Sequence, residues 1–254
     1  MFQPSVPTFD HLLRRMDLRN GLELAWTDEG TGEKTLVFVH GMASNLRAWR
    51  KNIPVLRDDF RCISLDLPNF GDSSRGDYPM SIPFLSGVLR EFLRPLEGEQ
   101  VVLVEADRPE NLLSLDPEQV VRTYELNFHH FPADAHFMLE DMAALAANGE
   151  YPHYCETLRR CVFGMVSDPI RTHFPAIQQD LLVLFGEDDA LIPHPRLHAD
   201  QSPRALIPAG VHELPRAQLQ FFEQCGHFLQ WEQSERFNQA VRDFLVSHPV
   251  NPKQ

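Results

Sequence analysis

The stretch "LVLFGEDDALIP", residues 182–193, joins a strand of buried type to a loop that carries reactive side chains. Its first four residues are all apolar, which is the pattern of a short, fully buried strand. Gly186 lets the backbone turn sharply where the strand ends, and Asp188 and Asp189 follow before Pro193. A carboxylate in such a loop can orient a histidine that acts as a base. Such a pair needs a histidine elsewhere in the chain, at a neighbouring strand end.

The histidine is found in "CGHFLQWE", where His227 follows Gly226 at the end of a predicted strand over 217–228. Two earlier strand ends also carry unusual residues. "LVFVHGM" ends in His40, Gly41 and Met42, and "DLPNFGDSS" brings Asp66 and Gly71. Ligands of open parallel sheets bind at the carboxyl ends of the strands. The pattern therefore predicts one site at one edge of a sheet.

The N-terminal half alternates strands with helices. Asn20-Gly21 predicts a β-hairpin over 16–30, and strands are predicted over 34–41, 60–66 and 98–105. The intervening helices are expected over 44–56, with Ser44 as its cap, and over 81–96. This alternation predicts an α/β fold, with a mostly parallel sheet flanked by helices.

Residues 116–178 show helical patterns only, over 116–131, 133–150 and 154–166. We interpret this region as a helical lid inserted into the fold. The alternation then returns, with a strand over 180–189 and a last helix over 234–248. The predicted organisation is a core of residues 1–107 and 179–254 with a lid of residues 108–178.

Composition limits the partners that we expect. The chain has 254 residues and a net charge of −13, which disfavours nucleic acid and anionic lipid as ligands. The N-terminus lacks a signal-peptide pattern and no apolar run is long enough to span a bilayer. Four scattered cysteines fit a reduced, cytoplasmic setting. The sequence leaves the oligomeric state open.

These motifs together resemble those of the α/β-hydrolase superfamily, in its branch of small, lidded, soluble hydrolases. The matching segments are "LVFVHGM", "DLPNFGDSS", "LVLFGEDDALIP" and "GHFLQWEQSERFNQAVRDFL". The resemblance implies that Asp189 is the triad acid, His227 the base, and the backbone at Gly41 and Met42 the oxyanion hole, with Asp188 a rival for the acid. It also implies hydrolysis of a small organic ester or related bond without a cofactor.

The nucleophile of that family is missing from its expected place. The family carries it in a G-x-S-x-G turn after a buried strand, and here the strand "VVLV" runs into "EADRP", residues 105–109. In one interpretation Asp107 is a covalent nucleophile, as in dehalogenases and epoxide hydrolases, although Glu105 and Pro109 stand where small residues are needed. In the interpretation that we favour, a strand and a helix of about 20 to 25 residues, the size of one α/β unit, are deleted.

The consequences for function follow from the missing turn. A triad without its nucleophile loses on the order of 10⁶ in turnover, so we expect activity to be weak or nil. A non-catalytic protein that binds a ligand or partner in the same cleft is the rival hypothesis. Apolar lid residues predict either a substrate pocket or simple packing on the core: Phe128, Phe131, Phe137, Met138 and Met142.

No metal site is expected in the lid. His129, His130 and His136 are close in sequence, but neighbouring histidines on a helix point apart.

Overall fold

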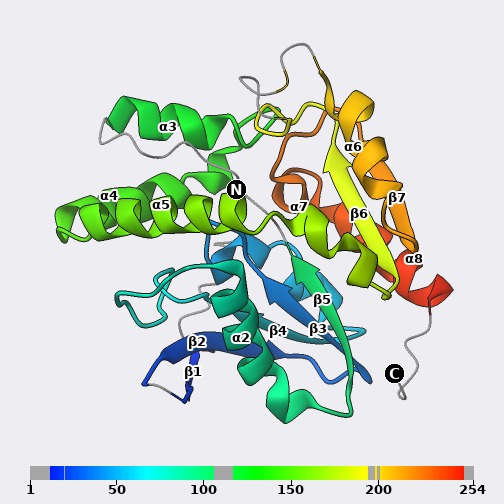
Figure 1. Ribbon diagram of the computed structural model, residues 1–254, viewed down its shortest axis with the longest axis horizontal. Coiled ribbons are helices and arrows are strands. Elements are labelled where there is room, and N and C mark those ends of the chain that lie inside the picture. Colours follow the sequence, from blue (N-terminus) through cyan, green and yellow to red (C-terminus); the bar gives the residue numbers. More distant parts are fainter. Residues whose placement is uncertain (1–11, 20, 106–116, 194–197, 199–200, 249–254) are drawn as a thin grey trace, which may run out of the picture. The chain divides into compact units, whose positions relative to one another are not determined.

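The computed structural model describes residues 12–19, 21–105, 117–193, 198 and 201–248 (Figure 1). Contacts divide the described chain into two compact units. The first unit covers residues up to 78 and 83–105, and the second covers 79–82 and the residues from 117 to 248. Asn20, in the predicted turn of the N-terminal hairpin, lies outside the described part of the chain.

The first unit is built on a five-stranded sheet in the order β1-β2-β4-β3-β5. Its strands are β1 (Arg14–Asp17), β2 (Glu23–Glu29), β3 (Lys34–Val39), β4 (Arg61–Leu65) and β5 (Gln100–Glu105). The predicted N-terminal hairpin is present as the antiparallel pair β1–β2, and β2 pairs antiparallel with β4. The strands β4, β3 and β5 run parallel, so the α/β class and its parallel centre are confirmed.

Short helices cover both faces of this sheet. On one face lie α2 (Ile82–Leu93) and η3 (Arg94–Leu96), where Phe92 of α2 meets Trp26 of β2 edge to face at 5.8 Å. On the other face lie η2 (Leu46–Trp49) and α1 (Ile53–Leu56), where the Trp49 ring packs 5.2 Å from Phe38. Each face of the sheet therefore buries aromatic side chains under a helix.

The single helix predicted over 44–56 is wrong in two respects. It is split into η2 and α1, because Pro54 has no N–H to continue a helix and instead lies in the first turn of α1. The cap of η2 is Asn45 rather than Ser44, and its side-chain oxygen accepts a hydrogen bond from the Arg47 amide at 3.0 Å.

The second unit contains a two-stranded parallel sheet of β6 (Leu181–Gly186) and β7 (Ala217–Phe222). The crossover between them includes α6 (Pro203–Val211), and β7 is followed by α7 (Leu229–Glu232) and α8 (Ser234–Ser247). The strand β7 ends six residues before the predicted boundary at 228, and Gln224 takes a positive φ of 53° in the turn that follows it. This turn carries His227.

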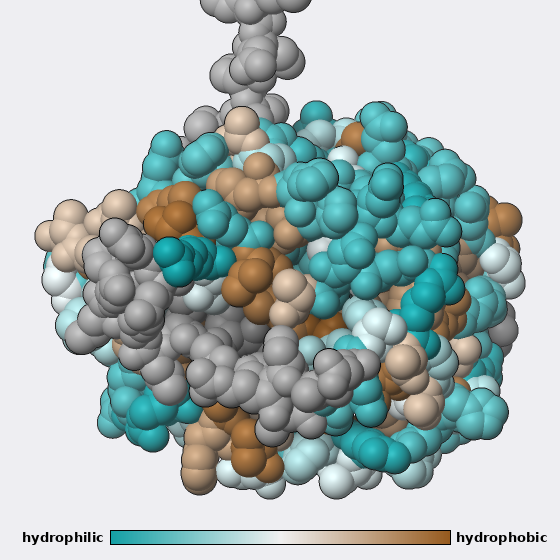
Figure 2. Space-filling model, turned by 90° about the horizontal axis from the view of Figure 1, so that it is seen from above, coloured by the Kyte–Doolittle hydropathy of each residue, from teal (hydrophilic) through white to brown (hydrophobic). Residues whose placement is uncertain are grey.

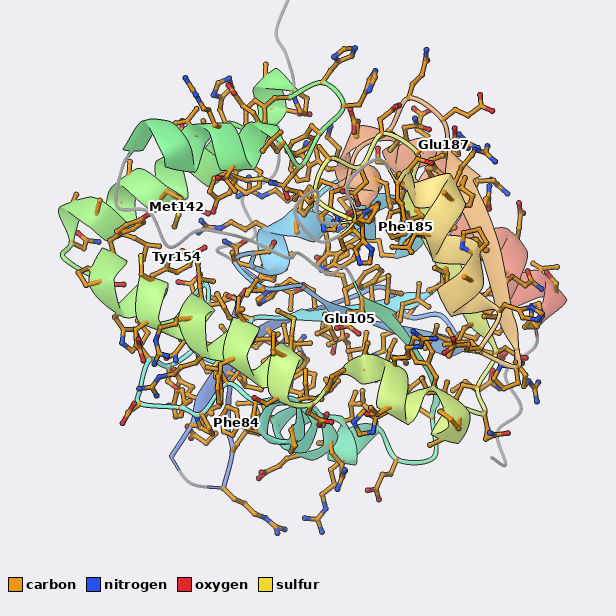
Figure 3. All side chains as sticks on the ribbon, turned by 45° about the horizontal axis from the view of Figure 1, so that its top comes forward. Phe84, Glu105, Met142, Tyr154, Phe185 and Glu187 are labelled. Carbon is orange, nitrogen blue, oxygen red and sulfur yellow. The ribbon has the colours of Figure 1, made fainter. Side chains whose placement is uncertain are left out.

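The rest of the second unit is helical. Its elements are α3 (Pro117–Glu125), η4 (Ala133–Ala135), α4 (Phe137–Ala147), α5 (Tyr151–Ser167) and η5 (Ile170–Ala176). Figure 1 shows α4 and α5 side by side, and Figure 3 labels the buried Met142 and Tyr154 on them. In the described chain, no helix is both long and apolar enough to span a bilayer.

The first helix of this region is shorter than predicted. It ends at Glu125 rather than at 131, and Asn127 folds back to donate its side-chain amide to the carbonyls of Thr123 and Tyr124, at 2.8 and 3.2 Å. These bonds satisfy carbonyl groups that a helix end leaves unpaired. His129 and His130 therefore lie beyond the helix.

Figure 2 shows one face, where hydrophilic residues predominate and apolar patches lie scattered among them. Isolated apolar residues on a surface are normal and need no special function.

The strand β5 has an unusually open face. Paired residues on neighbouring strands point to the same side of a sheet, and so do residues two apart on one strand. Leu103 therefore shares a face with its partner Val37 and with Val39. Val39 pairs with Leu65, which pairs with Trp26, so this is the face on which Trp26 lies beneath α2. Leu103 is nevertheless 51% exposed, whereas Val37 is fully buried. An open pocket of about 310 Å³ also lies along α2, lined by Ser86, Leu89, Arg90, Leu93, Arg94 and Glu97. Part of this face therefore has no covering helix among the described residues of the first unit.

This exposure predicts a difference between two leucines on neighbouring strands. Leu36→Ala on β3 should lower the free energy of unfolding by about 2–5 kcal/mol, because Leu36 is fully buried. Leu103→Ala should cost less than about 1 kcal/mol, since a half-exposed side chain leaves no cavity. Chemical denaturation of both variants measures this, and equal losses would contradict the open face.

Candidate active site

The second unit brings Asp189 and His227 together. Asp189 Oδ2 lies 2.7 Å from His227 Nδ1, and the two side chains are only 2% and 6% exposed. Asp189 follows β6 and His227 follows β7, and because these strands are parallel and adjacent their carboxyl ends meet at one edge. The sheet thus places a carboxylate against an imidazole although 38 residues separate them.

The backbone holds the Asp189 carboxylate in place. Its Oδ1 accepts hydrogen bonds from the amides of Leu191 and Ile192, at 2.8 and 3.0 Å. This leaves Oδ2 to accept the proton of His227 Nδ1, which fixes the tautomer with Nε2 as the basic nitrogen. Such an arrangement stabilises an imidazolium when the base takes up a proton.

Two glycines make this close approach possible. A Cβ on Gly186 would lie 2.0 Å from the Gly226 carbonyl oxygen, and one on Gly226 would lie 2.6 Å from the His129 nitrogen. A larger residue at 186 would push the loop after β6 away from the turn after β7, and one at 226 would push that turn away from residues 128 and 129.

Asp188 lies against a different histidine. Its Oδ2 is 3.3 Å from His129 Nδ1, and its amide donates to the Cys225 carbonyl at 3.0 Å. Of the two consecutive aspartates, the one that the structure pairs with His227 is Asp189. The catalytic role of Asp189 itself stays a prediction.

The predicted oxyanion residues Gly41 and Met42 lie directly after β3 in the first unit, and both are buried. The preceding His40 is fully enclosed, with Nδ1 donating to the Gly41 carbonyl at 2.8 Å and Nε2 accepting from the Leu67 amide at 2.9 Å. Burial lowers the pKa of His40 from 6.5 to about 4. His40 is therefore neutral and holds the loop that contains Met42. The oxyanion role stays a prediction.

Asp66 holds two loops together. Its carboxylate accepts from the amides of Leu46 and Asp72, at 2.7 and 2.8 Å, and Gly71 lies so close that a Cβ there would be 2.1 Å from Oδ2. Burial raises the pKa of Asp66 from 3.8 to about 7, against the opposing effect of these two hydrogen bonds. Both carboxylate oxygens bind the backbone, so Asp66 is a structural residue.

Ser73 and Cys225 are poorly placed to act as a nucleophile. The Ser73 hydroxyl donates to the Asp66 carbonyl at 2.7 Å and accepts from the Ala25 amide at 2.8 Å. Cys225 is fully buried, which raises the pKa of its thiol to about 12 and disfavours the reactive thiolate. Asp107 and Ser114 lie outside the described residues. Figure 3 labels Glu105, the last residue of β5.

The predicted pocket residues are packed against neighbours. Phe128 is buried and meets Phe228 at 5.6 Å, Met138 is buried, and the half-buried Phe137 lies 5.1 Å from the Trp231 ring. These contacts show packing within the second unit. A role in binding substrate stays a prediction for all three.

The expectation that His129 and His130 point apart is wrong. They lie beyond the end of α3, and their ring centroids are 4.2 Å apart. In the described residues, no group of three or more His, Cys, Asp or Glu side chains is placed to hold a metal ion.

Sequence reasoning missed Glu232. Its carboxylate accepts hydrogen bonds from three backbone amides, those of Gly226, His129 and His130, at 2.8, 3.1 and 2.8 Å. The available signal was its place five residues after His227 within a segment already matched to the family.

Burial of His40 predicts a pH effect on stability. Because its pKa is lowered in the fold, the unfolded chain binds the extra proton, and stability is lost as pH falls from about 6.5 to about 4. This contribution is about 3 kcal/mol. Asp66 acts in the opposite direction over a similar range, since its pKa is raised.

Comparison with His40→Gln isolates the histidine. From pH 7 to pH 4, the unfolding free energy of wild type should fall relative to this variant by about 3 kcal/mol. His212→Gln, at an exposed position, is the control and should follow wild type. Parallel pH profiles of wild type and His40→Gln would contradict the burial argument.

The comparisons with known proteins concern the fold and the family. A sequence profile described as "alpha/beta hydrolase fold" matches residues 34–104. A 2-hydroxy-6-oxononadienedioate/2-hydroxy-6-oxononatrienedioate hydrolase from Paraburkholderia phymatum is 26% identical and covers 90% of this chain and 93% of its own. That alignment spans 283 positions, more than the 254 residues of this chain, so the relative contains segments that have no counterpart here.

Solved structures show the same fold. A "probable hydrolytic enzyme" from Pseudomonas aeruginosa superposes with a TM-score of 0.80 at 16% identity, covering 92% of this chain and 94% of that one. An esterase from Exiguobacterium antarcticum gives 0.72 at 15% identity, covering 91% and 98%. With the strand order, these findings show that the chain has the α/β-hydrolase fold.

Proposed function

We propose that this protein is a hydrolase-like member of its superfamily that retains the acid and base of the triad without a serine nucleophile. Its site would act, without a cofactor, on a small organic ester or related bond, at a rate far below that of a complete triad. The observation that carries the proposal is the enclosed Asp189–His227 hydrogen bond of 2.7 Å.

This pair supports one kind of chemistry. With Nδ1–H directed to Asp189, His227 can take a proton at Nε2 and the carboxylate stabilises the resulting charge. Without a serine, the proton donor would be a water molecule that attacks the substrate directly. That route lacks the covalent intermediate, and loss of a triad nucleophile costs on the order of 10⁶ in turnover.

Three observations support the loss of a strand and a helix after β5. The family match ends at residue 104, one residue before β5 ends. The Paraburkholderia phymatum relative contains segments that this chain lacks. Leu103 is half exposed on a sheet face that α2 covers elsewhere, as expected where a covering helix is missing.

The relatives suggest the substrates to test. Their names describe hydrolases of 2-hydroxy-6-oxononadienedioate, and among the structural neighbours are esterases. We therefore propose a small carboxylic ester or a related oxo-dienedioate as the substrate class.

Kinetics with a p-nitrophenyl ester and with 2-hydroxy-6-oxononadienedioate test the proposal. We expect slow turnover without a burst phase, because no acyl-enzyme accumulates. His227→Ala should reduce the rate to the uncatalysed background, since the base is lost.

The matched control is His173→Ala, which breaks an exposed His173–Asp168 pair of 2.8 Å and should leave the rate unchanged. A burst phase, or turnover that survives in His227→Ala, would contradict the proposal. Tight binding of either compound without turnover would favour the non-catalytic alternative.

A further inference from the structure

The residues on either side of His227 are hydrogen-bonded, one to the segment 127–130, which follows α3, and the other to Glu232. The residue after it, Phe228, donates its amide to the Asn127 carbonyl at 2.8 Å. The residue before it, Gly226, donates its amide to Glu232 Oε2 at 2.8 Å. The turn that carries the base is therefore fixed by one direct bond to this segment and by one bond to a carboxylate.

The same carboxylate also binds the segment. Glu232 Oε2 accepts from the His129 amide at 3.1 Å, and Oε1 accepts from the His130 amide at 2.8 Å. More than 100 residues of sequence separate these donors from Glu232, so the bonds are tertiary contacts. Hydrogen bonds to an ionised acceptor are stronger than those between neutral groups.

Packing leaves little freedom between the two backbones. A Cβ on Gly226 would lie 2.6 Å from the His129 nitrogen and 2.7 Å from the Phe128 Cα, so the turn and the segment are in direct contact. The Phe128 ring meets Phe228 edge to face at 5.6 Å. A second polar link joins the segment to the other loop of the site, because His129 Nδ1 lies 3.3 Å from Asp188, the residue before Asp189.

We propose that Glu232 is a positioning residue for His227: it clamps the His227 turn to segment 127–130 and so keeps the imidazole on Asp189. It makes no contact with the reacting atoms in this account. The inference rests on the proposed role of His227 as the base, but its test does not depend on hydrolysis. A displacement of segment 127–130 would move the base with it.

Glu232→Gln is the decisive variant. Glutamine has almost the same shape but offers one acceptor oxygen, so at least one of the three amides meets an NH₂ group instead. Glu235→Gln is the matched control, since it makes the same chemical change three residues away at an exposed position. Both are made in the full chain, and a cooperative thermal unfolding transition in each shows that both fold.

Two measurements follow in solution. Amide hydrogen exchange reports on Gly226, His129 and His130, and the imidazole Nδ1–H signal of ¹⁵N-histidine-labelled protein reports on the His227–Asp189 bond, with His227→Ala giving its assignment. In Glu232→Gln we expect at least about tenfold faster exchange at these amides and loss of the His227 signal. Glu235→Gln should match wild type in both.

Two results would overturn the proposal. Unchanged exchange at the three amides would show that Glu232 does not clamp them. Faster exchange with an unchanged His227 signal would show that the clamp is structural and does not position the base. Should Glu232→Gln unfold, Glu232→Asp decides by the same criteria, since it retains the charge on a shorter side chain. Absence of hydrolysis in wild type would affect only the proposed function.

Discussion

The hydrogen bond between Asp189 and His227 is the interaction on which the account of the site depends. It needs two parallel strands that end together, a carboxylate held by two backbone amides, and two glycines where the loops touch. Its enclosure matters because charge interactions strengthen when water is excluded.

In the proposed triad, a histidine held in this way would be the base that activates a nucleophile. In this chain the strand β5 pairs in parallel with β3 and ends at Glu105, and the match to the family stops at residue 104. The half-exposed Leu103 lies on the same strand. These observations concern the same point of the chain, and they support a protein that has kept its acid–base pair after losing the unit that bears the nucleophile.

Much of the fold could be predicted from the sequence, because its signals are local. Asn-Gly and alternating apolar residues predicted the hairpin β1–β2, and regular apolar spacing predicted α2. Helix ends were harder. Pro54 divided one predicted helix, and Asn45 rather than Ser44 caps its first part. The helix α3 ends earlier than predicted, where the Asn127 side chain donates to carbonyls of the last turn of that helix. These are side-chain effects that apolar periodicity does not report.

The candidate site was predictable in part, for the same reason. Asp189 and His227 each follow an apolar strand at a glycine, and this local pattern identified them before the structure paired them. The clamp by Glu232 has no comparable signal, because it is made to backbone amides and two of the three, those of His129 and His130, lie more than 100 residues away in the sequence. Asp107 lies outside the described residues, so its role is a matter for experiment.

The central claim is that the chain retains a catalytic base but has no activated serine. Intact-mass spectrometry after treatment with a fluorophosphonate, with a complete serine hydrolase as positive control, tests it most directly. The account predicts that the mass of this protein stays unchanged while the control is labelled. Stoichiometric labelling of a serine that depends on His227 would contradict it.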